Sequence, residues 1–496
     1  MDTRSVAPKV LIAIIGAGLS GIAMAVQLKR KLGINDFVIY DQASSIGGTW
    51  QANKYPGCAV DVPGPAYSFS FAPNPKYTKW FPSQKDILDY INGVAKSYGI
   101  NHHVSLGTCL AKGYWDEAKR SWLLKLKNLQ TGESFTQECS ILISATGNLS
   151  QPHHGRISDM EIFRGRVVHT SEWNESVDLD GKRVAVVGNG CSSAQLVPAI
   201  AGRSHSVYQF MRTPQTYVPS MNPRVHPLLK FIFVHAPLLL CFCRWIILMT
   251  GDLLFQEYRI SQFGDRARRA SERRSLEYVK KTAPMEYWPL LLPSYPKGCK
   301  RVVRDHGYLA CLRQPNVHVI GEAIESLCET GAFTKSGKYF PVDIVILATG
   351  FDTSRPHFKL TGREGTTLTE HWEGFGAKEA YKSVAVSGFP NFFMIYGPNG
   401  AFAHTSALVA IEASVNLILN VAQPVVQKQR STVEISLERE RAYYQRTRQG
   451  LRDTIWENCQ SYYKDSSGHN VFLYPWSAAW FYLHMAFERR SSWQYS

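Results

Sequence analysis

The chain has 496 residues, which is more than one compact core usually holds, so two or three globular units are expected. Hydrophobic residues make up 45% of it and charged residues 19%, proportions that exclude a disordered or fibrous chain. The formal net charge of +15 favours anionic partners, but the basic residues are scattered and no nucleic-acid-binding motif accompanies them, so we expect no nucleic-acid partner.

The first predicted element is a buried strand, Lys9–Ile15, that runs into a glycine-rich turn and then a helix over residues 22–31. Within the turn, Gly16 permits a sharp bend, Gly18 lets the backbone approach a pyrophosphate, and Gly21 lets the helix pack close to the sheet. The pyrophosphate would lie at the N-terminus of the helix, where free N–H groups favour negative charge.

A second strand, Val38–Tyr40, ends at Asp41, about 20 to 25 residues beyond the glycines. A carboxylate at this place can accept hydrogen bonds from ribose hydroxyls. Strand, turn, helix, strand and acid therefore follow one another in the order of a dinucleotide-binding fold.

Two later segments share one pattern: Ile141–Gly147 reads ILISATG, and Ile344–Gly350 reads IVILATG. Each predicts a buried strand that ends in Ala-Thr-Gly and returns the chain to a nucleotide-binding sheet. The alternative interpretation of either segment, taken alone, is that Ala-Thr-Gly only forms a tight turn at the end of a strand.

A second copy of the strand, turn and helix begins at the strand Arg183–Val187. Gly188 and Gly190 are the glycines that admit phosphate, and a serine in place of the third glycine allows a slightly wider gap between helix and strand. The candidate cofactor-binding residues of this turn are Gly188, Gly190, Ser192, Ser193 and Ala194.

The next strand, Val207–Phe210, ends not in an acid but in Met211, Arg212 and Thr213. A cation and a hydroxyl suit a 2′-phosphate, which an acid would repel, so this turn is predicted to prefer NADPH to NADH. A solvated surface charge is the alternative interpretation of Arg212.

Two apolar stretches, residues 228–254 and 471–487, raise the question of a membrane. The first contains Lys230 and Arg244 and the second Pro475, so neither has the roughly 20 uninterrupted apolar residues that spanning requires. We therefore expect buried helices and no transmembrane segment, and peripheral membrane contact stays open for the first stretch.

The ten cysteines show no CxxC pair and no regular spacing, which favours reduced thiols in a reducing, cytoplasmic compartment over a disulfide framework. The one close pair, Cys241 and Cys243, lies in an apolar stretch that looks helical and has no matching second pair. Buried packing is the better interpretation of that pair, and we expect no metal site.

The block that follows the first glycine turn carries a family resemblance. Gly47–Trp50 reads GGTW and Tyr55–Asp61 reads YPGCAVD, and with two glycine turns in this order the chain resembles class B flavoprotein monooxygenases, the Baeyer–Villiger group most of all. The wider block is similar to fungal members that act in secondary metabolism. The resemblance implies FAD on the first turn, with nearby candidate residues Gly48, Thr49, Trp50, Asp61, Val62 and Tyr67.

The segment 163–174 resembles the fingerprint of the Baeyer–Villiger group, FxGxxxHxxxW followed by Pro or Asp. Its matching residues are Phe163, Gly165, His169 and Trp173, which the resemblance assigns to a hinge, although Asn174 departs from the pattern. Trp173 favours this group over the flavin monooxygenases that oxygenate nitrogen or sulfur, and Asn174 keeps that alternative open.

Lys300 and Arg301 resemble the family's Lys-Arg pair at the return to the NADP domain. The resemblance implies that Lys300 contacts the 2′-phosphate and that Arg301 faces the flavin, where Asp61 would hold its guanidinium. The implied reaction uses NADPH, FAD and molecular oxygen to convert a small-molecule ketone into an ester or lactone. In it, Arg301 would stabilise negative charge on oxygen. A solvated basic cluster is the alternative interpretation of these two cations.

The order of elements predicts an α/β fold with two Rossmann-like domains, for FAD and for NADP, and a helical insert in the NADP domain. The predicted ranges are 1–152 and 385–496 for the FAD-binding domain, 153–214 and 296–384 for the NADP-binding domain, and 215–295 for the insert.

Overall fold

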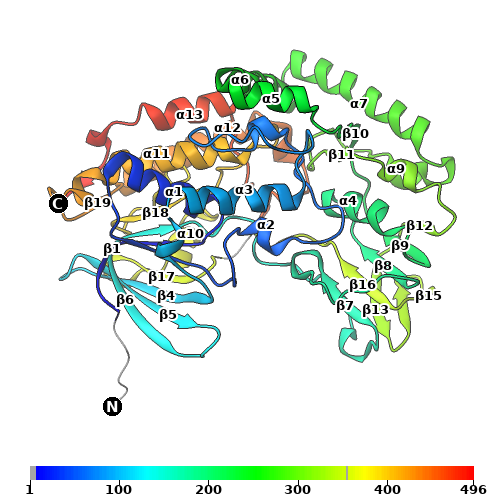
Figure 1. The fold of residues 1–496 in the computed structure, drawn as a ribbon, viewed down its shortest axis with the longest axis horizontal. Helices are drawn as coiled ribbons and strands as arrows, with labels where there is room; N and C mark the ends of the chain where they lie inside the picture. Colours follow the sequence, from blue (N-terminus) through cyan, green and yellow to red (C-terminus); the bar gives the residue numbers. More distant parts are fainter. Residues whose placement is uncertain (1–6, 354–355) are drawn as a thin grey trace.

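The computed structural model of the chain describes residues 7–353 and 356–496, so the first six residues of the predicted FAD-binding range lie outside it. Two separate β-sheets, each covered by helices, lie side by side, and a layer of long helices lies across one side of them (Figure 1). The predicted α/β fold with two Rossmann-like units and a helical insert is confirmed.

The first sheet has the order β17-β4-β5-β6-β1-β2-β3, and β18 pairs with β6. Apolar runs make β1, β2 and the end of β6 parallel central strands that are buried on both faces, whereas β4, β5 and β6 form an antiparallel extension. The strands are β1 Val10–Ile15, β2 Phe37–Tyr40, β3 Val104–Ser105, β4 Thr108–Asp116, β5 Ser121–Asn128, β6 Ser134–Ser144, β17 Lys359–Thr361 and β18 Phe392–Met394.

Helices cover the first sheet and form its largest core with it. The long apolar helix α11 packs against α1 and α13, and nearly all of α1 is buried because small side chains let it lie close to the sheet. These helices are α1 Leu19–Gln27, α2 Thr49–Ala52, α3 Gln84–Ser97, α10 Leu368–Phe375, α11 Ala407–Val426, α12 Leu437–Arg452 and α13 Ala478–Ala486. A small ladder, β19 Val433–Glu434 with β20 Gln494–Tyr495, lies near the C-terminus.

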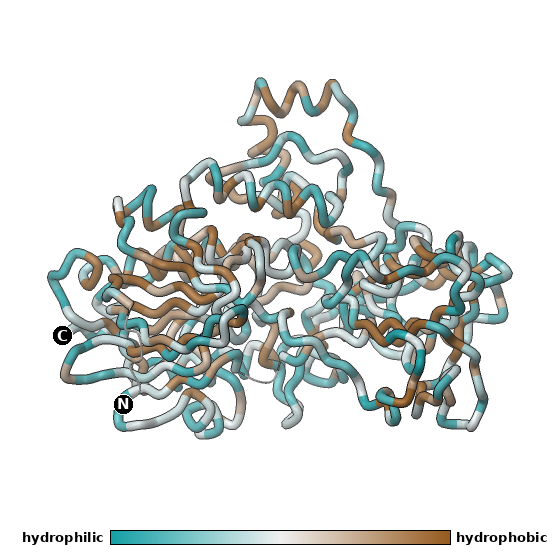
Figure 2. Tube along the Cα trace, turned by 60° about the horizontal axis from the view of Figure 1, so that its bottom comes forward, coloured by the Kyte–Doolittle hydropathy of each residue, from teal (hydrophilic) through white to brown (hydrophobic). Residues whose placement is uncertain are grey.

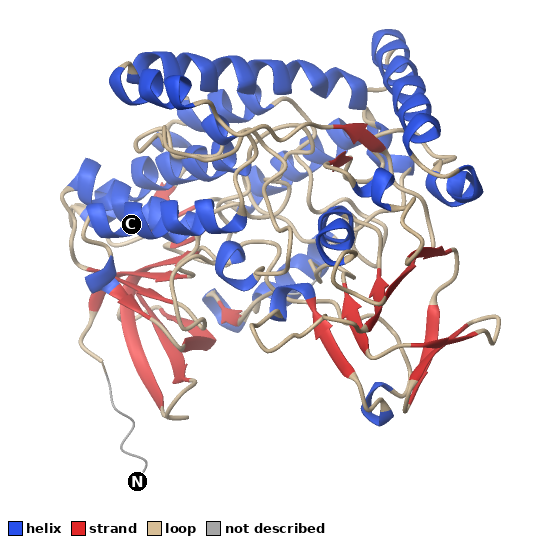
Figure 3. Cartoon of the chain, turned by 45° about the vertical axis from the view of Figure 1, so that its right-hand side comes forward, coloured by secondary structure: helices blue, strands red, loops and turns tan. Residues whose placement is uncertain are grey.

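The second sheet is parallel throughout, in the order β12-β9-β8-β16-β7 (Figure 3). Its strands are β7 Arg166–His169, β8 Arg183–Val187, β9 Ser206–Phe210, β12 Val317–Ile320 and β16 Ile344–Leu347, and α4 Cys191–Ile200 and α9 Tyr308–Cys311 pack on it. Two smaller ladders, of β10 Tyr217–Pro219 with β11 Val303–Asp305 and of β13 Ile324–Cys328, β14 Gly331–Thr334 and β15 Tyr339–Pro341, complete this unit.

The predicted Ala-Thr-Gly segments end central strands in both units. β6 and β16 each lie beside the strand that precedes a glycine turn, β1 in the first sheet and β8 in the second. β17 pairs with β4 of the first sheet although its residues, 359–361, fall within the range predicted for the NADP-binding domain.

The insert is helical, as predicted, with α5 Pro227–His235, α6 Pro237–Leu253, α7 Gln262–Thr282 and α8 Trp288–Leu291. The prediction that its apolar stretch is buried is wrong. α6 lies on the surface (Figure 2), Cys241 is exposed and Cys243 half-buried. Among the described residues, 237–258 and 407–426 are helical, long and apolar enough to cross a membrane, but 67% of the second is buried as a core helix and only 17% of the first.

Candidate active site

The first glycine turn is built against its own sheet. Gly16 has φ +114°, and a Cβ on it would collide with the carbonyl oxygen of Ala145, the alanine of the first Ala-Thr-Gly segment. A Cβ on Gly21 would collide with the Gly16 carbonyl oxygen, and one on Gly18 would meet the Cα of Gly48 at 3.4 Å. The turn therefore offers a bare backbone surface at the N-terminus of α1, as a pyrophosphate requires.

Asp41 lies at the carboxyl end of β2, where a ribose is expected. Its Oδ2 accepts a hydrogen bond from the Ala17 N–H at 2.6 Å, and its Oδ1 accepts one from the Ala43 N–H at 2.8 Å. The carboxylate is thus fixed to the glycine turn, and its remaining lone pairs can still accept ribose hydroxyls.

The other candidate FAD residues line the approach to this turn. Gly48 precedes the short helix α2, which contains Thr49 and Trp50. The indole Nε1 of Trp50 donates to the Tyr67 hydroxyl at 3.1 Å, and both rings pack edge to face. Val62 is half-buried and packs on the core of the first sheet. Burial raises the pKa of Tyr67, so its hydroxyl stays protonated.

The second glycine turn repeats the geometry of the first. Gly188 has φ +118°, and a Cβ on it would collide with the carbonyl oxygen of Ala348, the alanine of the second Ala-Thr-Gly segment. A Cβ on Gly190 would meet no atom within 4 Å, so the backbone there faces open space at the start of α4. The two Ala-Thr-Gly segments thus have the same role, because each leaves room only for glycine in the facing turn.

The serines of the second turn point in two directions. Ser193 and Ala194 are buried against the sheet, and among the described residues the Ser193 hydroxyl has no hydrogen-bond partner. Ser192 Oγ lies 3.3 Å from the hydroxyl oxygen of Tyr55. The same hydroxyl donates to Gln195 at 2.8 Å, so the segment after α2 is attached to the helix of the second turn.

Two cations and a hydroxyl meet where β9 ends. Lys300 Nζ donates to Thr213 Oγ1 at 2.5 Å and lies 5.2 Å from the centre of the Tyr295 ring. Burial, and then the charge of Arg212, lowers the pKa of Lys300 below its ordinary value. Across residues 7–353 and 356–496 no carboxylate lies within 4.0 Å of either cation, so an anion from outside the chain would find two positive charges there without a carboxylate partner.

Arg301 and Asp61 form a bidentate pair between the two units. The Nη2 of Arg301 donates to Asp61 Oδ2 at 2.7 Å and its Nε donates to the same oxygen at 3.0 Å. Burial alone would raise the pKa of Asp61, but the facing guanidinium brings that pKa below its ordinary value, and the carboxylate raises the pKa of Arg301. Both groups therefore stay charged at neutral pH, in a directional, charge-assisted contact.

Aromatic rings surround this pair on the side of the C-terminal segment. Tyr258 packs against Trp456 with ring centres 5.1 Å apart, and Phe402, whose carbonyl oxygen accepts from Arg301 Nη1 at 3.5 Å, lies beside His404. The side chains of Arg301 and Asp61 keep 29% and 23% of their surface exposed, so the rings cover the pair only in part.

The fingerprint segment connects β7 to both units. His169 is fully buried, and its Nε2 lies 3.0 Å from the carbonyl oxygen of Gly350, the glycine of the second Ala-Thr-Gly segment. Phe163 is buried, and a Cβ on Gly165 would collide with its ring. Trp173 packs on the core of the second sheet, and the turn just before it contacts α2 of the first unit.

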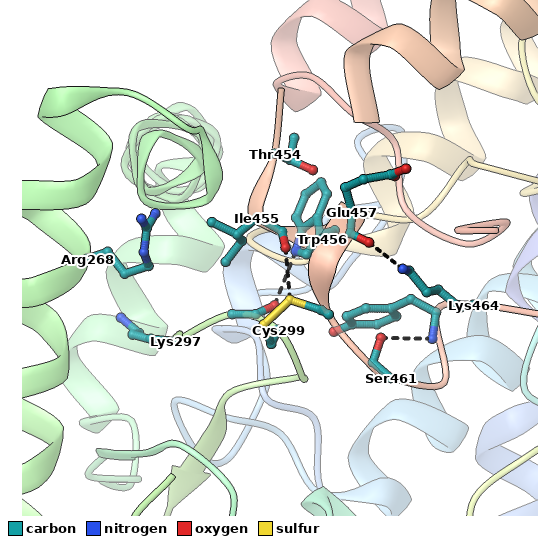
Figure 4. The surroundings of a disulfide bond; sticks show 12 residues. Arg268, Lys297, Cys299, Thr454, Ile455, Trp456, Glu457, Ser461 and Lys464 are labelled. Carbon is teal, nitrogen blue, oxygen red and sulfur yellow. Dashed lines mark hydrogen bonds between the residues drawn. A yellow bond between two sulfur atoms is a disulfide. The ribbon is translucent and has the colours of Figure 1, made fainter. Parts of the chain in front are cut away.

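A disulfide joins Cys299 and Cys459, so the prediction that all cysteines are reduced thiols is wrong for this pair. The two Cα atoms lie 5.2 Å apart although 160 positions separate them in the chain, and the sequence holds no signal for such a pairing. Figure 4 shows Cys299 between Lys297 and Trp456 of the C-terminal segment. The Nε1 of Trp456 donates to the Gly298 carbonyl at 3.2 Å. The other eight cysteines are free thiols.

These positions fit the two predicted cofactors. Bare glycine turns at the N-termini of α1 and α4 suit pyrophosphates, Asp41 suits a ribose, and the cations at residues 212 and 300 suit a 2′-phosphate. Among the described residues no group of three or more His, Cys, Asp or Glu side chains is placed to hold a metal ion.

Comparisons with known proteins agree with this geometry. A family profile described as an NAD(P)-binding Rossmann-like domain matches residues 14–82. The chain is 32% identical over 472 residues to an FAD-binding monooxygenase of Aspergillus niger, and the match covers 92% of this chain and 77% of the relative. It is 31% identical to a Baeyer–Villiger monooxygenase of Pseudomonas aeruginosa, over 94% of this chain and 87% of the relative.

The fold is similar to that of a solved cyclohexanone monooxygenase from a Rhodococcus species, bound to NADP+. The TM-score is 0.87, and the match covers 99% of this chain and 100% of that one. Because the two sequences are 23% identical, this likeness concerns the fold alone.

Proposed function

We propose that Arg301 and Asp61 are the catalytic pair of this enzyme. The chain belongs to the Baeyer–Villiger family of FAD- and NADPH-dependent monooxygenases. The enzyme inserts one oxygen atom of O2 next to a ketone carbonyl to give an ester or lactone. The observation that carries the proposal is the bidentate contact between these residues, one after α2 in the first unit and the other before β11 in the second.

FAD, reduced by NADPH, supplies the electrons and the site at which oxygen is activated. The role of the chain is to place a fixed positive charge where an oxygen atom carries negative charge during the reaction. Removal of a comparable donor in other enzymes costs roughly 3 to 4 kcal/mol. Because Asp61 raises the pKa of Arg301, the guanidinium serves as an electrostatic partner and not as an acid.

We also propose that the unit of the first sheet, residues 7–152 with the C-terminal part, binds FAD, and that the unit of the second sheet binds NADPH. The lack of carboxylate partners for Arg212 and Lys300 among the described residues supports the second assignment. The pairing of β17 with β4 moves the proposed return to the FAD-binding unit from residue 385 to before residue 359. The remaining segment, residues 163–173, would act as the hinge between the two units.

The substrate is proposed to be an apolar small-molecule ketone, because apolar rings line the surroundings of Arg301. The fungal relative supports a place in secondary metabolism. The eight free thiols support a cytoplasmic location, which requires that the disulfide between Cys299 and Cys459 persist in a reducing compartment.

The experiment offers the purified holoenzyme NADPH, labelled 18O2 and two probes, a cyclic ketone and an alkyl aryl thioether, in separate reactions. Mass spectrometry should find one labelled oxygen in an ester or lactone made from the ketone. A labelled sulfoxide as the product, with the ketone returned unchanged, would contradict ester-forming chemistry and favour heteroatom oxygenation.

A further inference from the structure

Large apolar side chains are concentrated on one surface of the described part of the chain. They lie on α5, α6, the turn after α6 and α13, which contact one another (Figures 1 and 2). Leu238 is 82% exposed and Phe487, just beyond α13, is 78% exposed. The surface, called the apolar face below, consists of Leu228, Phe231, Val234, Leu238, Leu239, Phe242, Trp245, Ile246, Leu253, Leu254, Trp480, Tyr482, Leu483 and Phe487.

The charged side chains of α6 point inward, opposite to the usual arrangement in a surface helix. Arg244 is buried, donates to the Ser68 carbonyl oxygen and pairs with Glu412 at 3.2 Å. Asp252 lies 3.1 Å from His404 Nε2 and accepts the Ala478 N–H at the start of α13 at 2.6 Å. A buried ion pair and a buried histidine–carboxylate contact therefore fix α6 lengthwise on the FAD-binding unit with its apolar side facing outward.

These contacts restrict the orientation that α6 can adopt at a membrane. A helix that crossed a bilayer would carry Arg244 and Asp252 away from Glu412 and His404 and leave them without partners in hydrocarbon, at high cost. A helix that stays on the protein can only lie flat in the interface, with its apolar side chains inserted. Trp245 and Trp480 are of the type that anchors such helices at the level of the lipid headgroups.

The helix that follows has a positive outer surface. The exposed charges of α7 are six cations against the single anion Glu277. The acids nearest in sequence to the apolar face each have a partner: Asp252 has His404, Glu257 has Lys297, Asp265 has Arg268 and Glu488 has Lys382. The six exposed cations are Arg266, Arg269, Arg273, Arg274, Lys280 and Lys281.

We propose that the apolar face, with the cations of α7, docks the enzyme in the plane of an anionic phospholipid bilayer. Exposed apolar side chains supply insertion into the interface, and exposed cations beside them supply attraction to acidic headgroups. A second copy of this chain carries the same positive charge, so pairing of two copies through this face would bring like charges together.

Sedimentation with vesicles tests the proposal, using holoenzyme and vesicles of phosphatidylcholine alone or mixed with phosphatidylserine. The wild type should sediment with the mixed vesicles and much less with the neutral ones. The double variant Phe242→Glu/Trp245→Glu should bind roughly tenfold or more weakly. Leu129→Glu/Phe333→Glu adds the same charge at exposed positions outside the face and should bind as the wild type does.

The charge of α7 is tested separately with Arg266→Gln/Arg274→Gln, which should lose most of the preference for acidic vesicles. FAD content and NADPH oxidation measured without vesicles should be unchanged in every variant, which shows that each is folded. The proposal is overturned if the wild type stays in the supernatant with both vesicle types. It is also overturned if light scattering shows a dimer that Phe242→Glu/Trp245→Glu converts to a monomer.

Discussion

A single carboxylate sets the state of the guanidinium at position 301. Asp61 offers both oxygens to it, and the mutual effect lowers one pKa and raises the other, so neither group changes charge across the neutral range. The two residues are 240 positions apart, and only the family resemblance suggested that they meet. Single substitutions can test the contribution of this pair to stability and, separately, the recognition of the 2′-phosphate of NADPH.

Asp61→Asn removes the negative partner and should lower the free energy of unfolding by roughly 1.5 to 3 kcal/mol at pH 7. Since the folded-state pKa of Asp61 lies below its ordinary value, the pair stabilises the fold above about pH 4 and ceases to do so as the pH falls through the lowered pKa. Thermal unfolding of wild type and variant from pH 7 to pH 3 should therefore show a gap in Tm that closes only in acid. A gap that widened in acid would contradict the assignment.

Arg212→Ala should raise the KM for NADPH roughly 10- to 100-fold and leave the KM for NADH nearly unchanged, because it removes one charged contact to the 2′-phosphate. Steady-state kinetics with both coenzymes measures this selectivity. Arg224→Ala, an exposed arginine beyond the β9 turn, is the matched control and should change neither. Equal losses for both coenzymes would show that Arg212 does not recognise the phosphate.

Two elements of the same kind, a strand followed by a glycine turn and a helix, make the two cofactor sites. The sequence predicted them well because both signals are local: apolar runs define β1 and β8, and glycines mark the bend after each. The part of each turn that lies against the glycine comes from a distant segment of the chain. The alanine carbonyl that excludes a side chain at Gly16 or Gly188 comes from a strand more than a hundred positions further along the chain, so the function of Ala-Thr-Gly was not evident from the sequence.

The pair Gly188→Ala and Gly190→Ala separates the fold of a turn from its function. Alanine at Gly188 meets a carbonyl oxygen and an unfavourable φ, so it should destabilise the second unit by about 1 to 3 kcal/mol. Alanine at Gly190 meets no protein atom, so Tm should hold while NADPH binds more weakly, since its Cβ enters the space proposed for the pyrophosphate. Calorimetry and NADPH titration distinguish the two, and unchanged NADPH binding in Gly190→Ala would remove the turn from the cofactor site.

The whole molecule depends on contacts that sequence patterns do not encode. Fold class followed from apolar runs, but the side of α6 that faces outward is set by Glu412 and His404, which lie far along the chain. The apolar stretch was therefore predicted to be buried when it is exposed. The disulfide between residues 299 and 459 depends likewise on how the C-terminal segment meets the segment that follows the insert.

The disulfide predicts how many thiols of the enzyme react with an alkylating reagent before and after reduction. Alkylation of the unfolded, unreduced enzyme followed by intact-mass measurement should label eight thiols, and reduction should raise the number to ten. Cys459→Ser should lower the free energy of unfolding by about 2 to 4 kcal/mol, whereas Cys241→Ser, at an exposed free thiol, should not. Ten labelled thiols before reduction would show that the pair is not joined in solution.

The most direct test of the central claim is the ratio of ester formed to NADPH consumed by Arg301→Ala. The account predicts that this variant binds FAD and oxidises NADPH, yet the ratio falls to nearly zero because the reacting oxygen lacks its fixed positive partner. A ratio equal to that of the wild type would contradict the role given to Arg301 and to the carboxylate that holds it.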